Sequence, residues 1–337
     1  FVIARNSTFT YKGKPVKVQQ VAEELGVRYV LEGSVQRSGN DLRVTAQLVD
    51  ALNGRHLWAD RFDRQAEDLF AMKDEITHKV LIELQVKLIS GDHARAASRG
   101  TESLEAWLLY NQARAHALKW TRESHLKARE LYEKAAEIDP NYARTWAGIG
   151  LTYYYEARLG GWQMSREEAL TKGFELAEHA IEIGPQQPLG YQVMANIYLL
   201  KGEHDRAVAL AEKSADLAPN NFQAISVVGW QSFWAGDVQR SLDAFARLKR
   251  VSPRYSAWIP GVEGAALHFA GRHDDAVATL KEAIRRLPTA WMAHARLVAV
   301  YVDSDRMKEA KSAAAELLET RPNFTVGNFM KTQPFKN

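Results

Sequence analysis

The chain has 337 residues, more than the roughly 250–300 at which a single hydrophobic core stops growing, so two domains or a repeat array are expected. Apolar residues make up 46% and charged residues 25%, which is typical of globular proteins and excludes disordered or collagen-like chains. The 44 basic and 41 acidic residues interleave along the chain, giving a net charge of +3 and no cluster of basic residues that could bind a phosphate backbone. No nucleic acid is therefore predicted as a partner.

Several kinds of chemistry are absent from the sequence. It contains no cysteine, which excludes disulfides, zinc ribbons and thiol catalysis. The histidines are scattered singly and no glycine-rich phosphate loop is present, so we predict no catalytic residue, cofactor or metal site in this chain. No run of 18 apolar residues and no signal peptide occur. We expect a cytoplasmic location, or a periplasmic one if a membrane span or signal peptide lies upstream.

The first 65 residues combine one short helix with strands. Residues 16–25 place apolar side chains on one helical face, and Gly26 supplies a stop signal. The period then changes to two in residues 28–50, RYVLEGSVQRSGNDLRVTAQLVD, where RSGND separates two alternating segments. The Asn-Gly pair at 53–54 is a hairpin signal that leads into RHLWADRF. A meander of three antiparallel strands is predicted, with FVIAR as a candidate fourth strand.

The alternation also predicts how this sheet packs. If the second turn is tight, two cross-strand pairs follow: Val49 with Trp58, and Thr45 with Phe62. The apolar face of the first two predicted strands consists of Leu31, Val35, Val44 and Leu48. We expect the helix at 16–25 and a long amphipathic helix at 66–90 to cover this face. A linker is expected at 91–103, where the composition changes.

Four segments carry a family resemblance: FVIARNSTFTYKG, VAEELGVRYVLEGSV, RVTAQLVDALNGRHLWADRFDR and DEIT. Together they resemble the amino-terminal α/β domain of the translocation protein TolB, in the TolB-like form of multidomain bacterial signalling proteins. The resemblance implies a TolB-like domain over residues 1–90. In that family an apolar strand and a helix come before this point, so the resemblance also implies truncation at the N-terminus and a sheet with an exposed edge.

Prolines recur in the rest of the chain, each closing a helical pattern: Pro140, Pro185, Pro219, Pro253, Pro288 and Pro322. Their spacings of 45, 34, 34, 35 and 34 residues resemble the tetratricopeptide repeat, a pair of helices with a 34-residue period. We expect about six repeats within 104–337 and a right-handed superhelix with a concave surface, which makes the fold mainly α. The 11 extra residues lie around RLGGWQMSREEA, where Ser165 and Glu168 can form a capping box. The final FTVGNFMKTQPFKN is expected to pack on the last repeat as the start of a capping segment.

In tetratricopeptide proteins the first helix of each repeat lines the groove. Applied to this chain, that register predicts a partner-binding groove formed by Tyr154, Tyr155, Asn196, Leu199, Leu200, Trp230, Phe233, Trp234, Trp258, His268 and Phe269. Few charges fall on this surface, and the basic residues of the family's carboxylate clamp are missing. The predicted occupants are a protein or peptide, the protein's own upstream domain, or a second copy. The alternative is that these aromatic residues pack between helices, although Trp230 and Trp234 together favour partner contact.

A TolB-like domain followed by tetratricopeptide repeats resembles the C-terminal half of bacterial class III adenylate/guanylate cyclases. The resemblance implies an upstream domain that makes cyclic AMP from ATP with two magnesium ions, and a non-catalytic segment here that regulates it or recruits partners. Two alternatives stay open: the sensor region of a winged-helix transcriptional regulator of the CadC type, and a cell-envelope scaffold. The upstream gene sequence separates the three. The ligand, the sign of regulation and the oligomeric state are not indicated.

Overall fold

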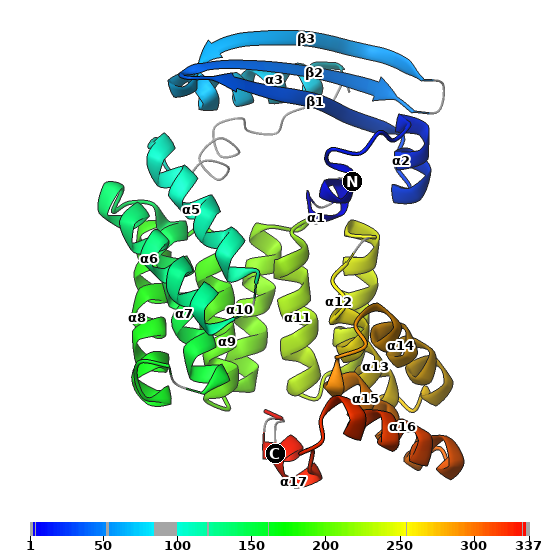
Figure 1. The fold of residues 1–337 in the computed structure, drawn as a ribbon. Helices are drawn as coiled ribbons and strands as arrows, with labels where there is room; N and C mark the ends of the chain where they lie inside the picture. Colours follow the sequence, from blue (N-terminus) through cyan, green and yellow to red (C-terminus); the bar gives the residue numbers. More distant parts are fainter. Residues whose placement is uncertain are drawn as a thin grey trace.

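The computed structural model describes residues 3, 5–51, 54–83, 100–119, 121–160, 162–253, 255–331 and 333–334. A three-stranded antiparallel sheet with short helices forms the N-terminal part, and stacked helix pairs form the rest (Figure 1). The structure therefore confirms the predicted fold class of a mainly helical protein with one small sheet. None of the described helices is both long and apolar enough to cross a membrane.

The chain enters the sheet through short helical segments. The predicted fourth strand covered residues 1–5, of which only residues 3 and 5 are described. Residue 3 lies in no strand and Arg5 begins helix α1 (Arg5–Thr8), so the prediction is wrong for these two residues; the 3-10 helix η1 (Phe9–Tyr11) follows. Helix α2 (Val18–Leu25) follows and buries Leu25 on its apolar face. It ends as predicted at Gly26, whose φ of 65° is in the left-handed region that favours glycine.

The sheet has the order β1 (Tyr29–Ser38), β2 (Asp41–Asp50) and β3 (Arg55–Gln65). The second hairpin differs from its prediction, because Asp50 pairs with Arg55 and four residues instead of two separate the paired strands. An irregularity between Leu48 and Val49 then recovers one residue of this shift. The observed pairs are Leu48 with Trp58 and Val44 with Phe62. The prediction placed the partners one residue further along β2, because it assumed a two-residue turn at 53–54 and no bulge.

The helical cover of the sheet is narrower than predicted. The 3-10 helix η2 (Ala66–Asp68) leads into helix α3 (Leu69–Glu83), which lies against β3 and β2, and residues 84–90 of the predicted helix fall outside the described residues. Val44 belongs to the same apolar cluster as Met72 of α3, as expected, and Leu48 is also buried. Leu31 and Val35 are 50% and 67% exposed, so the prediction that helices cover them is wrong. They lie on the edge strand β1, whereas the main contacts of the described part of α3 are with β3 and β2.

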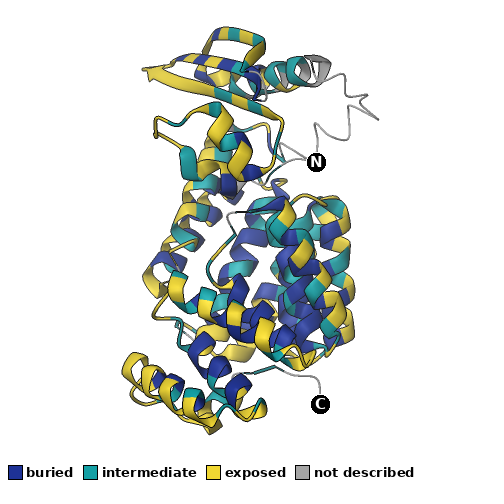
Figure 2. Cartoon of the chain, turned by 90° about the vertical axis from the view of Figure 1, so that its right-hand side faces the viewer, coloured by how far each residue is buried: buried dark blue, intermediate teal, exposed yellow. Residues whose placement is uncertain are grey.

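Six helix pairs form the array, as predicted. Their bounds are α5 (Leu104–Ala117) with α6 (Arg122–Ile138), α7 (Ala143–Leu159) with α8 (Arg166–Ile183), α9 (Pro188–Leu200) with α10 (His204–Leu217), α11 (Phe222–Trp234) with α12 (Val238–Val251), α13 (Ile259–Phe269) with α14 (His273–Arg286), and α15 (Trp291–Asp303) with α16 (Met307–Thr320). Small residues allow the helices of a pair to approach closely: a Cβ on Gly229 would lie 2.8 Å from the Phe245 ring. Figure 2 shows buried residues concentrated between the stacked helices.

Glycines form the turns inside the later repeats. Gly202, Gly236 and Gly271 have φ values of 79°, 84° and 72°. Asp305 occupies the same place in the last repeat with a φ of 58°, and it is the one non-glycine residue with positive φ in the described part of the chain. The tight turn thus requires a left-handed residue even where the sequence has no glycine.

A buried ion pair anchors the insertion in the second repeat. The Arg129 Nη2 donates to Glu156 Oε2 at 2.7 Å, and these side chains are only 6% and 0% exposed. Glu156 Oε1 accepts hydrogen bonds from the backbone N–H groups of residues 162–164, at 3.2, 2.6 and 3.1 Å. Burial alone would raise the pKa of Glu156, but the hydrogen bonds from Arg129 and the loop amides outweigh it and lower that pKa. The predicted capping box of Ser165 and Glu168 then starts α8.

A buried histidine lies beside this insertion. His125 is 1% exposed and its ring stacks on Tyr155 and Trp162, with ring centroids 4.8 and 5.6 Å away. Burial, with a smaller contribution from the nearby Arg129 charge, lowers the pKa of His125 to about 4. The ring is therefore neutral at physiological pH and serves as a packing surface for the inserted loop.

The chain closes on the last repeat. Helix α17 (Val326–Lys331) follows α16, and Phe324 and Phe329 pack against Trp291 with ring centroids 6.2 and 6.0 Å away. This confirms the predicted packing of the final segment. The segment then runs back towards the third repeat, where the carbonyl of Pro334 lies 2.8 Å from His204 Nε2.

Candidate binding groove

The first helices of the repeats form the inner layer of the array. Helix α7 packs on α9, α9 on α11, and α13 on α15, whereas the second helices of neighbouring repeats have no contacts of comparable extent. Helices on the inside of a curved stack approach each other more closely than those on the outside, so the first helices line the concave side. Contact between α11 and α13 is sparse, and the connection before α13 contains Trp258. Aromatic rings span this junction, with centroids 6.0 Å apart for Trp230 and Trp258 and 5.7 Å apart for Phe233 and Phe269.

The predicted groove residues divide by exposure. Five are buried in the helix core, namely Tyr154, Asn196, Leu199, Phe233 and Trp234; four are half-buried, namely Tyr155, Leu200, Trp230 and His268; and two are exposed, namely Trp258 at 37% and Phe269 at 60%. The buried five pack between helices, which corrects the expectation that their side chains face a partner. The helical period explains why some predicted groove residues are buried. Residues at different positions of one turn point in different directions, so some side chains of a first helix face the second helix of the same repeat instead of the concave surface. Partner contact by the accessible six stays a prediction.

Trp230 and Trp234 illustrate the difference between accessible and buried groove residues. Their rings meet edge to face with centroids 5.4 Å apart, but Trp234 is only 2% exposed. Trp230 is half-buried and also meets the exposed Trp258 at 6.0 Å. Phe269 continues the apolar surface on α13. We call the accessible residues Trp230, Trp258 and Phe269 the aromatic strip.

Two arginines that the prediction did not name lie near the inner aromatic residues, one at Trp230 and one at Phe233. The Arg158 guanidinium carbon is 5.2 Å from the centroid of the Trp230 ring, and Nη1 is 3.5 Å from the hydroxyl of Tyr154. Interaction with Tyr154 raises the pKa of Arg158. No carboxylate of the described residues forms an ion pair with this guanidinium. Sequence reasoning missed it because an arginine at a helix C-terminus is usually explained by the helix dipole.

Arg296 is the second arginine, and it is only 9% exposed. Its Nη1 donates a hydrogen bond of 2.9 Å to the carbonyl of Gly261, and its guanidinium carbon lies 6.0 Å from the centroid of the Phe233 ring. Burial lowers the pKa of Arg296 to about 10, so the side chain remains charged at neutral pH. Over the part of the chain that the structure describes, no carboxylate pairs with it.

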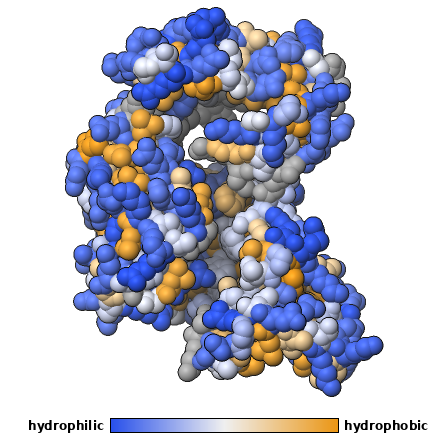
Figure 3. All heavy atoms as spheres, in the orientation of Figure 1, coloured by the Kyte–Doolittle hydropathy of each residue, from blue (hydrophilic) through white to orange (hydrophobic). Residues whose placement is uncertain are grey.

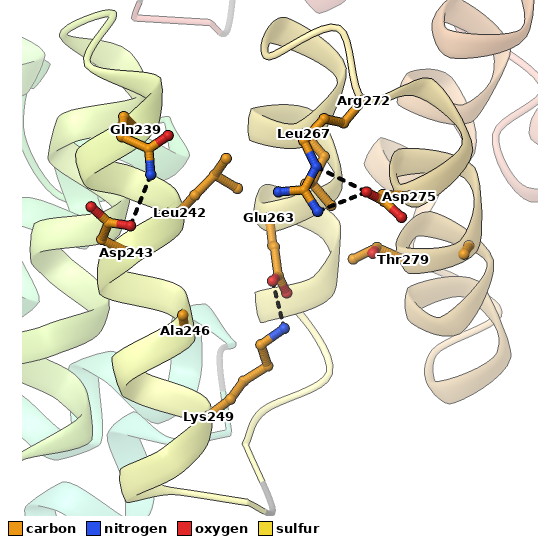
Figure 4. Close-up of a pocket in the computed structure, with 11 residues that line it drawn as sticks. Gln239, Leu242, Asp243, Ala246, Lys249, Glu263, Leu267, Arg272, Asp275 and Thr279 are labelled. Carbon is orange, nitrogen blue, oxygen red and sulfur yellow. Dashed lines mark hydrogen bonds and ion pairs between the residues drawn. The ribbon is translucent and has the colours of Figure 1, made fainter.

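A separate hollow of about 390 Å³ lies between α12, α13 and α14 (Figure 4). Most of its polar groups pair with each other: Lys249 Nζ lies 2.5 Å from Glu263 Oε1, and Arg272 pairs with Asp275 at 2.7 Å. Glu263 Oε2 is buried without a hydrogen-bond partner. No group of three or more His, Asp or Glu side chains within the described ranges is placed to hold a metal ion.

The face of the molecule drawn in Figure 3 is mostly hydrophilic, with apolar residues in smaller patches. The aromatic strip is one accessible apolar surface of the inner layer, and the Arg158 guanidinium places positive charge on its Trp230 ring. Arg296 lies beside the buried Phe233, whose ring meets that of Phe269. Such a surface can bind a partner's apolar side chains and a negatively charged group. It contains no assembled nucleophile, base and orienting group.

The comparisons with known proteins agree with this architecture. The family model for the tetratricopeptide repeat matches residues 190–221, which span most of α9 and α10. The array is a tetratricopeptide-repeat fold. Among solved structures, the Cut9–Hcn1 hetero-tetramer of the APC/C is 16% identical with a TM-score of 0.52, covering 80% of this chain and 53% of that chain. The human IFIT1 dimer with m7Gppp-AAAA is 15% identical with a TM-score of 0.52, covering 63% and 50%. These likenesses concern the fold alone.

Two curated proteins show the likeness in sequence. A protein of Rhizobium meliloti (strain 1021) named putative adenylate cyclase 3 is 40% identical over 195 residues, which are 58% of this chain and 33% of that protein. The mitochondrial import receptor subunit TOM70 of Mus musculus is 26% identical over 142 residues, covering 40% of this chain and 21% of the receptor. The matches thus span a third or less of the length of these relatives.

Proposed function

We propose that this chain is the regulatory and protein-interaction region of a class III adenylate cyclase. The 40% identity to the R. meliloti protein named putative adenylate cyclase 3 is the observation that carries this proposal. The tetratricopeptide fold supports an interaction role, because such arrays present an extended concave surface rather than a catalytic cleft. The sheet of β1, β2 and β3 would be a TolB-like domain between the catalytic domain and the array.

Regulation through this region has a simple physical form. Class III cyclases resemble one another in placing the active site at a dimer interface, so a partner that changes how two arrays associate also changes the population of active dimers. Binding shifts that equilibrium only by the difference in its affinity for the two states. The inner helices and the aromatic strip are the surface proposed for this binding.

The experiment compares the intact protein with the same protein lacking this region. Cyclic AMP formation from ATP is measured over a range of protein concentrations, so that an effect on dimerisation appears as a changed concentration dependence. The expected result is a different activity, or a different concentration dependence, after deletion. Equal activity at every concentration contradicts a regulatory role, and an intact protein that forms no cyclic AMP contradicts the cyclase assignment.

A further inference from the structure

The connection between the fourth and fifth repeats differs from the others. It consists of residues 252–258, seven in all, whereas the connections at 139–142, 184–187, 218–221 and 287–290 have four residues each. Helix α13 is correspondingly short, with 11 residues against 13 in α9, α11 and α15. The first helix of the fifth repeat thus starts late, and less of it is available to pack on its neighbours. We call residues 252–258 the joint.

Packing across the joint is the least extensive in the array. Within the described residues, α11 touches α13 less than any other two successive first helices touch each other. Likewise, α12 touches α13 less than any other second helix touches the first helix that follows it. The rings of Trp230 and Trp258 meet on one side of this gap in packing, and Lys249 Nζ lies 2.5 Å from Glu263 Oε1 on α13. The array bends most easily here, because few packed contacts oppose the motion.

The N-terminal segment docks on this joint. Ser7 of α1 and Ser252, the first residue of the joint, place their hydroxyl oxygens 3.0 Å apart, and both residues are 0% exposed. These residues are 245 positions apart in the chain. Figure 1 shows α1 between the sheet and the end of α12. The hydrogen bond therefore connects the array to the sheet of β1, β2 and β3 with its short helices, which we call the sheet domain.

This contact favours one arrangement and is still small enough to be released. Separating two buried hydroxyls costs free energy, because each loses a hydrogen-bond partner. However, α1 has only four residues, and a hydrogen bond between neutral groups makes a modest net contribution to stability. A partner bound to the aromatic strip contacts Trp230 on α11 and Trp258 in the joint, so its binding energy can act on the angle of the joint.

We propose that the joint is the hinge of the array and that α1 is a clamp that holds it in the arrangement seen here. Bending at the joint separates Ser252 from Ser7, releases α1 and lets the sheet domain move relative to the array. This inference rests on the proposed function, because it names the route by which binding at the inner helices reaches the sheet domain. A partner drives the release only through its different affinities for the clamped and the bent states.

The first test measures bending directly. Spin labels on Lys213→Cys of α10 and Ser312→Cys of α16 report the distance across the joint, in a chain that has no other cysteine. Ser7→Lys places a charged side chain at a position that is 0% exposed, which dislodges α1. The width of the distance distribution should then increase by about twofold, because the released hinge samples more angles.

Two controls make this result specific. Thr8→Lys adds the same charge at an exposed position of α1 and should keep the distribution of the wild type. Labels on Glu178→Cys of α8 and Lys213→Cys lie on one side of the joint, so Ser7→Lys should leave their distance unchanged. An unchanged distribution across the joint in Ser7→Lys overturns the clamp. Equal broadening at the control labels shows general loosening of the array and overturns the hinge.

The second test locks the clamp. In the variant that combines Ser7→Cys with Ser252→Cys, thiols replace two hydroxyls in contact, and oxidised glutathione should join them within one chain. The matched variant that combines Thr8→Cys with Ser252→Cys should form its disulfide about tenfold more slowly, because a disulfide requires close and correctly directed Cβ atoms. Amide hydrogen exchange of residues 252–258 should slow in the oxidised first variant and recover on reduction. Equal rates for the two variants, or exchange that oxidation does not change, overturn the proposal.

These readouts are independent of the proposed function. The clamp and the hinge can be confirmed even if deletion of the whole region leaves cyclic AMP formation unchanged. In the intact protein, oxidation of the Ser7→Cys and Ser252→Cys variant should change cyclic AMP formation, and reduction should restore it, whereas the same treatment of the protein without this pair should not. If deletion alters activity but the oxidised and reduced variants are equally active, the regulatory role stands and the clamp is not its route.

Discussion

The ion pair between Arg129 and Glu156 gives the sharpest prediction about stability. Glu156→Ala leaves the Arg129 guanidinium, whose side chain is 6% exposed, without its carboxylate. Removing one partner of a buried pair typically costs about 3–5 kcal/mol, because the remaining charge stays buried. The loop amides of residues 162–164 also lose their acceptor, but Gln163 is exposed, so water can replace part of that loss. We therefore expect a loss of about 3–5 kcal/mol.

The measurement must detect local as well as global unfolding, because repeat arrays do not always unfold as one unit. Urea unfolding followed by circular dichroism gives the change in free energy, and amide hydrogen exchange shows whether α6 to α8 open first. Glu178→Ala, at an exposed position on α8, is the control and should change the free energy of unfolding by less than about 0.5 kcal/mol.

A double variant separates the pair from its parts. Arg129→Met combined with Glu156→Leu removes both charges, and apolar replacement of a buried pair is often close to neutral. The double variant should therefore be more stable than Glu156→Ala. The reasoning is refuted if Glu156→Ala costs less than about 1 kcal/mol, or if the double variant is as unstable as the two single variants added together.

Two further predictions concern buried positions. The unfolded chain protonates His125 below its ordinary pKa of 6.5, whereas the folded protein, with Arg129 nearby, does so only near pH 4. The contribution of His125 to the free energy of unfolding is thus complete above pH 6.5 and falls as the pH drops towards 4, by at most about 3 kcal/mol. In urea unfolding measured between pH 4 and 7, the stability of His125→Phe should therefore depend less steeply on pH than that of the wild type. At Gly264 a Cβ would lie 2.6 Å from Cγ of Leu280, so Gly264→Ala should lower the free energy of unfolding by about 1–3 kcal/mol. Gly327→Ala, with no atom within 4 Å of its Cβ, should be near neutral, and equal effects at both positions contradict the packing argument.

The sequence alone determined the features that depend on local periodicity. The proline spacing of 34 to 35 residues in four of five intervals predicted six helix pairs, the capping box of Ser165 and Glu168 predicted where α8 starts, and the structure contains both. Alternation of polar and apolar residues, together with the turn signals, predicted the three strands, and the structure contains them. The strand and capping signals lie within a few residues of each other, and the proline period is read along the chain, so no tertiary contact is needed to interpret them.

The tertiary structure decided the properties that depend on what packs against a residue. Leu31 and Leu48 have the same pattern in sequence, yet Leu31 is 50% exposed and Leu48 is 2% exposed, because α3 covers one strand and not the other. Trp230 and Trp234 likewise differ only in what surrounds them. Arg296 resembles any helical arginine in composition, although aligning the repeats reveals it in a valine position. Its isolation from carboxylates is a property of three helices far apart in the chain, and pattern reasoning about one helix does not contain that information.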